Sequence, residues 1–137
     1  MQSNGSNKIS LKERLVTTIF GGIPNILLGK KIRNFVYRSL LNRIGKSVNI
    51  QHFVELIGTP YIEIGDTHFI IDENAYIGPY VTISGTGNIK IGKNCLIAPH
   101  CGIFANNHIF ADPTLSIEEQ GITGEGIVIE DDCWLGP

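Results

Sequence analysis

The amino-acid sequence predicts a mainly β fold, a parallel solenoid preceded by an α-helical segment. From Ile44 onward, aliphatic residues recur every sixth residue, and Gly, Asn, Asp and β-branched residues replace the helix formers. In residues 30–44, KKIRNFVYRSLLNRI, apolar residues instead recur every four residues, which is the spacing of a helix. With 137 residues, 42% of them hydrophobic, the chain can form one domain with its own core. We therefore expect a helical segment over 1–43 and a β domain over 44–137.

The first segment is strongly basic. Residues 1–46 contain nine of the eleven Lys and Arg residues but only one acid, Glu13. A helix from about Ser10 to Phe20 should end at Gly21, and the helix over 30–44 should keep its arginines outside the apolar stripe and end at Gly45. These helices either pack across the end of the β domain or form a basic amphipathic surface that rests on an anionic membrane. Residues 15–29 are too short and too interrupted to span a bilayer, which requires about twenty apolar residues.

The β domain consists of six-residue repeats, or hexads, which are most regular where they begin between Ile71 and Ile103. Each hexad forms a short strand and a turn, and three hexads form one triangular coil. The first position of a hexad points inward, the second is often Gly at a corner, and the fifth must be small because it also faces inward. The fifth positions are Ala75, Val81, Gly87, Cys95, Cys101, Asn107 and Cys133.

All three cysteines occupy this fifth position, which predicts small buried side chains rather than reactive thiols. Their odd number and the absence of a CxxC pair argue against a disulfide framework and a zinc site. No signal peptide is evident in the sequence. Together these features predict a reducing, cytoplasmic location, with peripheral contact on the inner face of the membrane as the alternative use of the helices.

Two insertions interrupt the repeat. The spacing from Ile71 to Ile91 is one coil plus two residues, and that from Ile91 to Ile129 is one coil plus twenty. Both insertions follow the third hexad of a coil and so fall at the same corner, where a solenoid accepts extra residues without disturbing its strands. The second predicts a protruding loop over residues 104–126.

The repeat [Ile/Leu]-Gly-x-x-small-x resembles the left-handed parallel β-helix of hexapeptide-repeat acyltransferases. Residues 107–136, NHIFADPTLSIEEQGITGEGIVIEDDCWLG, are most similar to sugar O-acetyltransferases of surface-polysaccharide biosynthesis and to the maltose and galactoside acetyltransferase group. The likeness covers residues 44–137. The chain stops at Pro137 in mid-hexad, whereas the family continues through further coils, so we expect this sequence to be incomplete at its C-terminus.

The resemblance implies an acetyl-CoA-dependent O-acetyltransferase that acts on a sugar or oligosaccharide as a homotrimer, without metal. His108 matches the catalytic base, Trp134 matches a tryptophan near the coenzyme A cleft, and the 104–126 loop matches a wall of the acceptor pocket. Tyr80 stands where some sugar acetyltransferases carry an acceptor-binding Asn, so the identity of the acceptor cannot be inferred from the family.

The residue types suit this chemistry. Acyl transfer from a thioester requires a base for the acceptor hydroxyl and donors for the oxyanion, and a mostly neutral histidine can serve as the base. The amides of Asn106 and Asn107 could position His108 or the acceptor. The loop acids Asp112, Glu118 and Glu119 could orient the imidazole, or could be solvated charges. Trp134 should point outward, toward either another subunit or the pantetheine arm.

Other functions remain open. The acceptor could be the amine of an amino sugar or a nucleotide sugar, which would make the protein an N-acyltransferase. A β-helical carbonic anhydrase would bind zinc through three histidines. His68, His100 and His108 match that number but not the spacing of the ligands. A non-catalytic β-helix, used for assembly, would not need a histidine-bearing loop. No nucleic-acid partner is expected.

Overall fold

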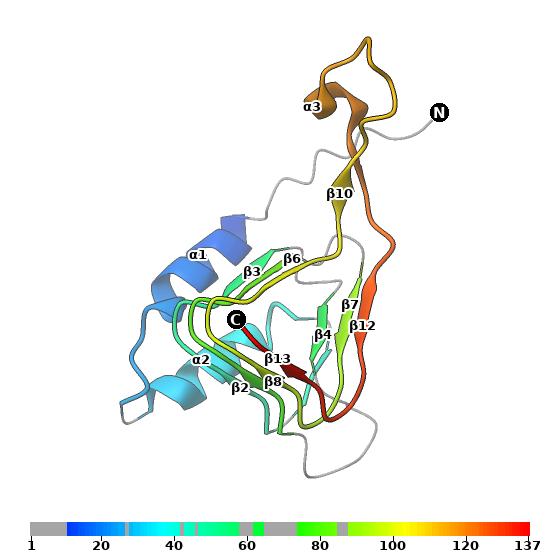
Figure 1. Cartoon of the computed structure of the whole chain (residues 1–137). Coiled ribbons are helices and arrows are strands. Elements are labelled where there is room, and N and C mark those ends of the chain that lie inside the picture. Colours follow the sequence, from blue (N-terminus) through cyan, green and yellow to red (C-terminus); the bar gives the residue numbers. More distant parts are fainter. Residues whose placement is uncertain are drawn as a thin grey trace.

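The computed structural model describes residues 11–26, 28–41, 43–45, 47–57, 62–64, 74–84 and 88–137, with the backbone alone at 62–64. Eleven short strands form three parallel sheets around a common core (Figure 1). The first sheet contains β1 (Arg43–Ile44), β4 (Ile62–Ile64), β7 (Ile89–Ile91) and β12 (Ile127–Ile129). The second contains β2 (Asn49–Ile50), β5 (Tyr76–Ile77), β8 (Leu96–Ile97) and β13 (Trp134–Leu135). The third contains β3 (Glu55–Ile57), β6 (Thr82–Ser84) and β9 (Gly102–Phe104).

The chain visits the three sheets in turn, so each circuit adds one strand to every sheet, as the sequence predicts for a solenoid. In the second sheet Ile50 pairs with Ile77 and Ile77 with Ile97, and in the third Leu56, Ile83 and Ile103 align in the same way. Stacked aliphatic residues therefore fill the core. Its most fully buried members include Ile50, Leu56, Ile77, Ile83, Ile91 and Ile97.

The predicted small positions are mostly confirmed. Ala75, Val81, Cys95 and Cys101 are buried, and Cys133 is half-buried. Asn107 is exposed, because the chain has left the coil before it reaches this residue. Gly87 lies outside the described residues.

The register corrects one part of the predicted repeat. Ile64, not Ile71, pairs with Ile91, so the strand before β5 ends thirteen residues before Ile77 instead of six. Ile71, which the predicted repeat places opposite Ile91, lies outside the described residues. The two predicted insertions lie before β7 and before β12, and both fall at the same corner, as predicted.

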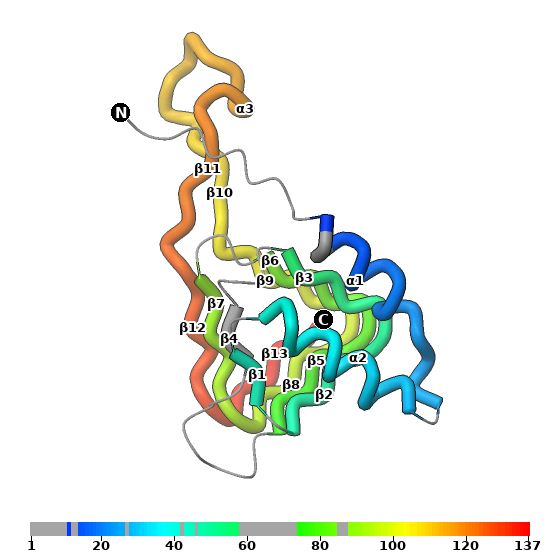
Figure 2. The backbone as a smooth tube through the Cα atoms, turned by 180° about the vertical axis from the view of Figure 1, so that it is seen from behind, coloured from blue at the N-terminus to red at the C-terminus, as the bar shows by residue number. Residues whose placement is uncertain are grey.

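Two helices close the end of the solenoid at its first coil. Helix α1 (Leu11–Gly21) lies against β3, and α2 (Gly29–Tyr37) lies against β2 (Figure 2). The prediction of a second helix extending to residue 44 is wrong. Helix α2 ends at Tyr37, since Leu40 and Leu41 turn into the core and Arg43–Ile44 already pair as β1. Gly45 is therefore not its C-cap.

The face of α2 that meets the coil is polar. Arg33 is fully buried, although the periodicity placed it outside the apolar stripe. Its guanidinium donates to the carbonyl of Ile50 at 2.8 Å, to that of Ile23 at 2.6 Å and to Asn25 Oδ1. The Asn34 amide donates to the carbonyl of Val48.

Tyr37 and α1 complete this contact. The Tyr37 hydroxyl donates to the carbonyl of Val54 at 3.0 Å, and burial raises the pKa of Tyr37 to about 12. The Phe53 backbone N–H donates to the carbonyl of Gly21 at 2.8 Å. The first coil would otherwise leave these backbone groups unpaired at an open edge. The interpretation that the helices pack across the end of the β domain is thus confirmed. Among the described residues, the helices fall short of the length and apolar character needed to cross a membrane.

Candidate functional site

The loop predicted over residues 104–126 is an arm that projects from one corner of the solenoid (Figure 1). Its neck is a two-stranded antiparallel ladder between β10 (Asn107–His108) and β11 (Ile122–Thr123). His108 pairs with Ile122, and the Ile109 N–H donates to the carbonyl of Gly121 at 3.1 Å. His108 therefore sits on a paired strand in the neck of the arm.

The tip of the arm is organised by its own polar groups. Helix α3 (Ile117–Gln120) begins with a capping box, in which Ser116 and Glu119 bond reciprocally. The Gln120 side chain accepts from the Asp112 N–H at 2.9 Å and donates to the Asp112 carbonyl at 3.0 Å. The Asp112 carboxylate accepts from the backbone N–H and the hydroxyl of Thr114. The arm thus has a defined shape despite its exposure.

These bonds use two of the acids proposed to orient His108. Hydrogen bonds from Thr114 lower the pKa of the Asp112 carboxyl, and bonds from Ser116 lower that of Glu119. In the described part of the chain, no hydrogen bond joins the His108 imidazole to Asp112, Glu118 or Glu119. The imidazole is exposed, so within one chain it faces solvent.

The two asparagines before His108 have different roles. The Asn107 side-chain oxygen accepts from the His108 backbone N–H at 2.9 Å. This bond holds the Asn107 side chain against the neck of the arm. Asn106 is half-buried at the base of the arm, and its Oδ1 is a buried acceptor with no hydrogen-bond partner among the described residues. An unpaired buried acceptor costs roughly 1–3 kcal/mol, so a donor supplied by a ligand or a second chain would be favourable there.

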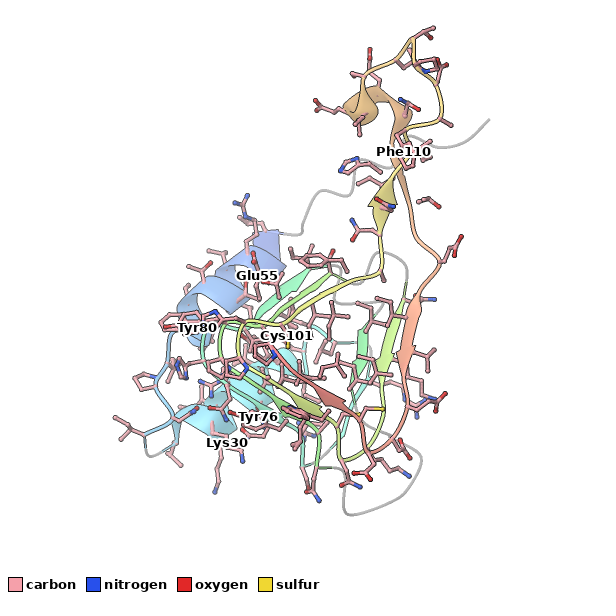
Figure 3. All side chains as sticks on the ribbon, viewed as in Figure 1. Lys30, Glu55, Tyr76, Tyr80, Cys101 and Phe110 are labelled. Carbon is pink, nitrogen blue, oxygen red and sulfur yellow. The ribbon has the colours of Figure 1, made fainter. Side chains whose placement is uncertain are left out.

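Tyr80 lies at a different corner from the arm (Figure 3). It is the middle rung of an aromatic ladder. Its ring stacks on Phe53 with centroids 5.2 Å apart and on His100 at 5.0 Å, and His52 meets Tyr80 edge-on at 5.8 Å. The structure therefore does not bring Tyr80 together with His108 in one chain.

This ladder was not predicted from the sequence, although its three stacked members hold the same position in hexads that begin at Ile50, Ile77 and Ile97. Phe53, Tyr80 and His100 each follow a stacked core isoleucine by three residues, and each has a positive φ of 56–64°. Bulky residues rarely adopt this conformation, so three of them in successive coils mark an unusual corner. The signal was therefore present in the sequence, as the shared spacing of these three residues from a core isoleucine.

Trp134 points outward, as predicted, with 75% of its surface exposed. It lies in β13 beside Leu96 of β8, which in turn lies beside Tyr76 of β5. This outward row on the second sheet is an exposed apolar strip, suited to a partner surface or to an apolar ligand.

The cysteines behave as core residues. Burial raises the pKa of the Cys95 thiol, which lies 3.0 Å from the carbonyl of Glu130, and the Cys101 sulfur lies 2.9 Å from the carbonyl of Gly136.

His68 lies outside the described residues, and His100 and His108 lie on different corners. Within the described ranges, no group of three His, Cys, Asp or Glu residues could hold a metal ion.

The fold is similar to that of a hexapeptide-repeat-containing acetyltransferase of Vibrio cholerae. Its complex with acetyl coenzyme A superposes with a TM-score of 0.71 at 23% identity, covering 90% of this chain and 60% of that one. A second structure of the same protein gives a TM-score of 0.64 at 25% identity, covering 91% of this chain and 68% of that one. The chain thus spans about 60% of the length of the first of these structures. No family model and no curated protein matches the sequence.

Proposed function

We propose that the protein is an acetyl-CoA-dependent O-acetyltransferase, acting on a sugar or oligosaccharide of surface-polysaccharide assembly. The observation that carries this proposal is an exposed histidine in an ordered arm, at one corner of a solenoid that superposes with an acetyltransferase complexed with acetyl coenzyme A. By the same likeness, the solenoid is a left-handed β-helix of the hexapeptide-repeat acyltransferase type.

His108 acts as the general base. Its imidazole takes the proton of the acceptor hydroxyl while that oxygen attacks the thioester carbonyl carbon. The tetrahedral intermediate collapses with cleavage of the C–S bond, and the imidazolium returns the proton to the departing thiolate. No covalent acyl-enzyme is required. Backbone N–H groups of a coil corner, or a neighbouring subunit, would stabilise the oxyanion.

The acceptor pocket is shared between subunits of a homotrimer. Within the described part of one chain, the His108 imidazole is exposed and Tyr80 lies on a different corner, and a second copy would bring the two corners together. In this arrangement Asn106, Asn107, Asp112 and Glu118 of one arm face the acceptor, with Tyr80 supplied by the neighbouring corner. The unpaired Asn106 oxygen is then an acceptor for a sugar hydroxyl.

Trp134 flanks the coenzyme A cleft. An exposed indole beside Leu96 offers a flat apolar surface for the pantetheine chain. A location on the cytoplasmic side of the membrane would supply acetyl-CoA and lipid-linked acceptors.

The test is coenzyme A release with acetyl-CoA and a panel of sugars and nucleotide sugars. We expect His108→Ala to reduce turnover by about 10²–10⁴-fold, which is the usual contribution of a general base. The side chain is exposed, so the variant should keep its circular dichroism spectrum and its oligomeric state. Added imidazole should restore part of the activity, which a purely structural histidine would not allow. Unchanged turnover in the variant would exclude the base role.

The same assay separates the alternative acceptor. An ester product is cleaved by hydroxylamine under mild conditions, whereas an amide resists it. Acetylated product that survives hydroxylamine would identify an N-acyltransferase on an amino sugar.

A further inference from the structure

The helical cap, α1 and α2 with the segment between them (residues 11–37), exposes several apolar side chains. In α1, Leu11, Leu15 and Ile19 lie four residues apart along one exposed line, while Val16 and Gly21 turn toward the coil. The connecting segment exposes Ile26 and Leu28, and α2 exposes Ile32 and Phe35. Among these, Phe35 is 76% exposed and Ile26 is 73% exposed.

This arrangement is the reverse of an ordinary surface helix, which buries its apolar stripe against the core. Helix α2 instead buries Arg33 and half-buries Asn34 to pair the carbonyls of the first coil. The coil edge needs hydrogen-bond donors, so Arg33, Asn34 and the Tyr37 hydroxyl turn toward it. Ile32 and Phe35 are left outside. Such a set of apolar side chains on one end of a molecule indicates a partner.

The charge of the cap identifies the partner's chemistry. Arg14, Lys30 and Lys31 are exposed beside these apolar residues, in a segment that has nine basic residues and one acid. Lysine is depleted at protein interfaces, whereas lysine and arginine next to an apolar stripe favour anionic headgroups. Their aliphatic stems can lie along the apolar surface while the charges reach the phosphates.

We propose that the helical cap is a docking surface for an anionic lipid bilayer, into which Phe35, Ile26 and the α1 line insert while Arg14, Lys30 and Lys31 contact the headgroups. The cap closes the first-coil end of the solenoid (Figure 2), so docking there leaves the arm and the later coils accessible. The proposal is independent of the acyl-transfer activity, because lipid binding needs neither acetyl-CoA nor an acceptor.

The test is co-sedimentation of the full chain with phosphatidylcholine vesicles and with vesicles that contain phosphatidylglycerol. We expect binding to the anionic vesicles that weakens with salt. Phe35→Ser should lower the partition coefficient by about tenfold or more, because burying a phenylalanine is worth roughly that factor. The matched control is Phe110→Ser on the arm, where the phenylalanine is 72% exposed, and it should bind like the unmodified chain.

The charge contribution is tested separately. Lys30→Glu combined with Lys31→Glu should lower binding to anionic vesicles by at least about tenfold, while Lys90→Glu on β7, also exposed, should have little effect. In a Trp134→Phe background, Phe35→Trp should give fluorescence that is quenched by lipids brominated on their acyl chains.

Three outcomes would overturn the proposal: no binding to anionic vesicles, binding that Phe35→Ser leaves unchanged, or a tryptophan at position 35 that brominated lipid does not quench. Concentration-dependent association of the chain that Phe35→Ser abolishes, without vesicle binding, would assign the cap to a second copy of the protein instead.

Discussion

Arg33 shows how one residue can link the helical cap to the solenoid. Its guanidinium reaches the carbonyls of Ile50 in the first coil and Ile23 in the connecting segment, and also the Asn25 side chain. Desolvation by burial lowers the pKa of Arg33. An arginine guanidinium nevertheless stays protonated in proteins. The buried charge is stabilised by backbone acceptors rather than by a carboxylate in this part of the structure.

We therefore expect Arg33→Met to destabilise the fold. Methionine fills a similar volume but leaves the three acceptors unpaired, and hydrogen bonds to a charged group contribute about 1.5–3 kcal/mol. The free energy of unfolding, measured by urea denaturation, should fall by roughly 3 kcal/mol. Arg14→Met, at an exposed position of α1, is the control and should change it by less than about 0.5 kcal/mol. Equal stability of the two variants would contradict this role of Arg33.

Sequence reasoning did not find the role of Arg33 for a physical reason. Periodicity assigns apolar residues to the inside because it assumes an apolar partner surface. The end of a parallel solenoid is instead a row of unpaired backbone groups, which selects the polar side of a helix. The same argument explains why α2 ends at Tyr37, where the chain must turn to start β1.

At the scale of the elements, the six-residue period predicted which residues face the core. The predicted inward residues are all buried: Ile77, Ile83, Ile91, Ile97 and Ile103. The inward position is set by one strand and its turn and does not depend on which strands pair in the neighbouring coil. Coil length was harder to predict. It depends on which strands pair across a corner, and an isoleucine that continues the period, such as Ile71, is not distinguished from the paired Ile64 by sequence alone.

The glycine at the second position of a hexad allows a prediction about this packing. A Cβ added to Gly78 would lie 2.7 Å from Pro99 N and 2.8 Å from the carbonyl oxygen of Ile97, both in the next coil. At Gly136, the same hexad position in the last coil that the structure describes, nothing lies within 4 Å. Gly78→Ala should therefore lower the free energy of unfolding by about 1–3 kcal/mol, since backbone must shift to accept the methyl group.

Gly136→Ala is the matched control and should leave the unfolding free energy within about 0.5 kcal/mol of the unmodified value. Urea denaturation of both variants checks the prediction. If Gly78→Ala is as stable as Gly136→Ala, successive coils do not approach each other as closely at this corner as the structure indicates.

At the scale of the whole molecule, the solenoid and the arm separate two tasks. The coils form a stacked scaffold with a buried core, and the arm carries the candidate base away from it. The sequence predicted where the arm begins and that it protrudes, because a break in the period marks a corner. It did not predict the hairpin neck or the capping box, which depend on pairings within twenty residues that no repeat constrains.

The arm's independence leads to a prediction about the whole fold. Residues 104–128 can be replaced by a second copy of residues 84–90, SGTGNIK, which join Ile83 to Ile91 at the same corner one coil earlier. Ile103 and Ile129 would then have the same spacing as Ile83 and Ile91. The hydrogen bonds that shape the tip join arm residues to one another, so their loss should leave the coils paired. Shortening a loop also changes its closure entropy only slightly.

We expect this variant to keep the β circular dichroism spectrum and to unfold within about 5 °C of the unmodified chain, which corresponds to roughly 1 kcal/mol.

Sedimentation velocity of the same variant measures its oligomeric state. The arm exposes Ile109, Phe110, Leu115, Ile117 and Ile122. If these side chains contact neighbouring subunits in the proposed trimer, removing them should shift the protein toward monomer while the fold persists. A variant that fails to fold would show that the arm supports the coils, and a trimer that survives its removal would place the subunit contacts on the sheets, where Trp134 and Leu96 form the exposed apolar row.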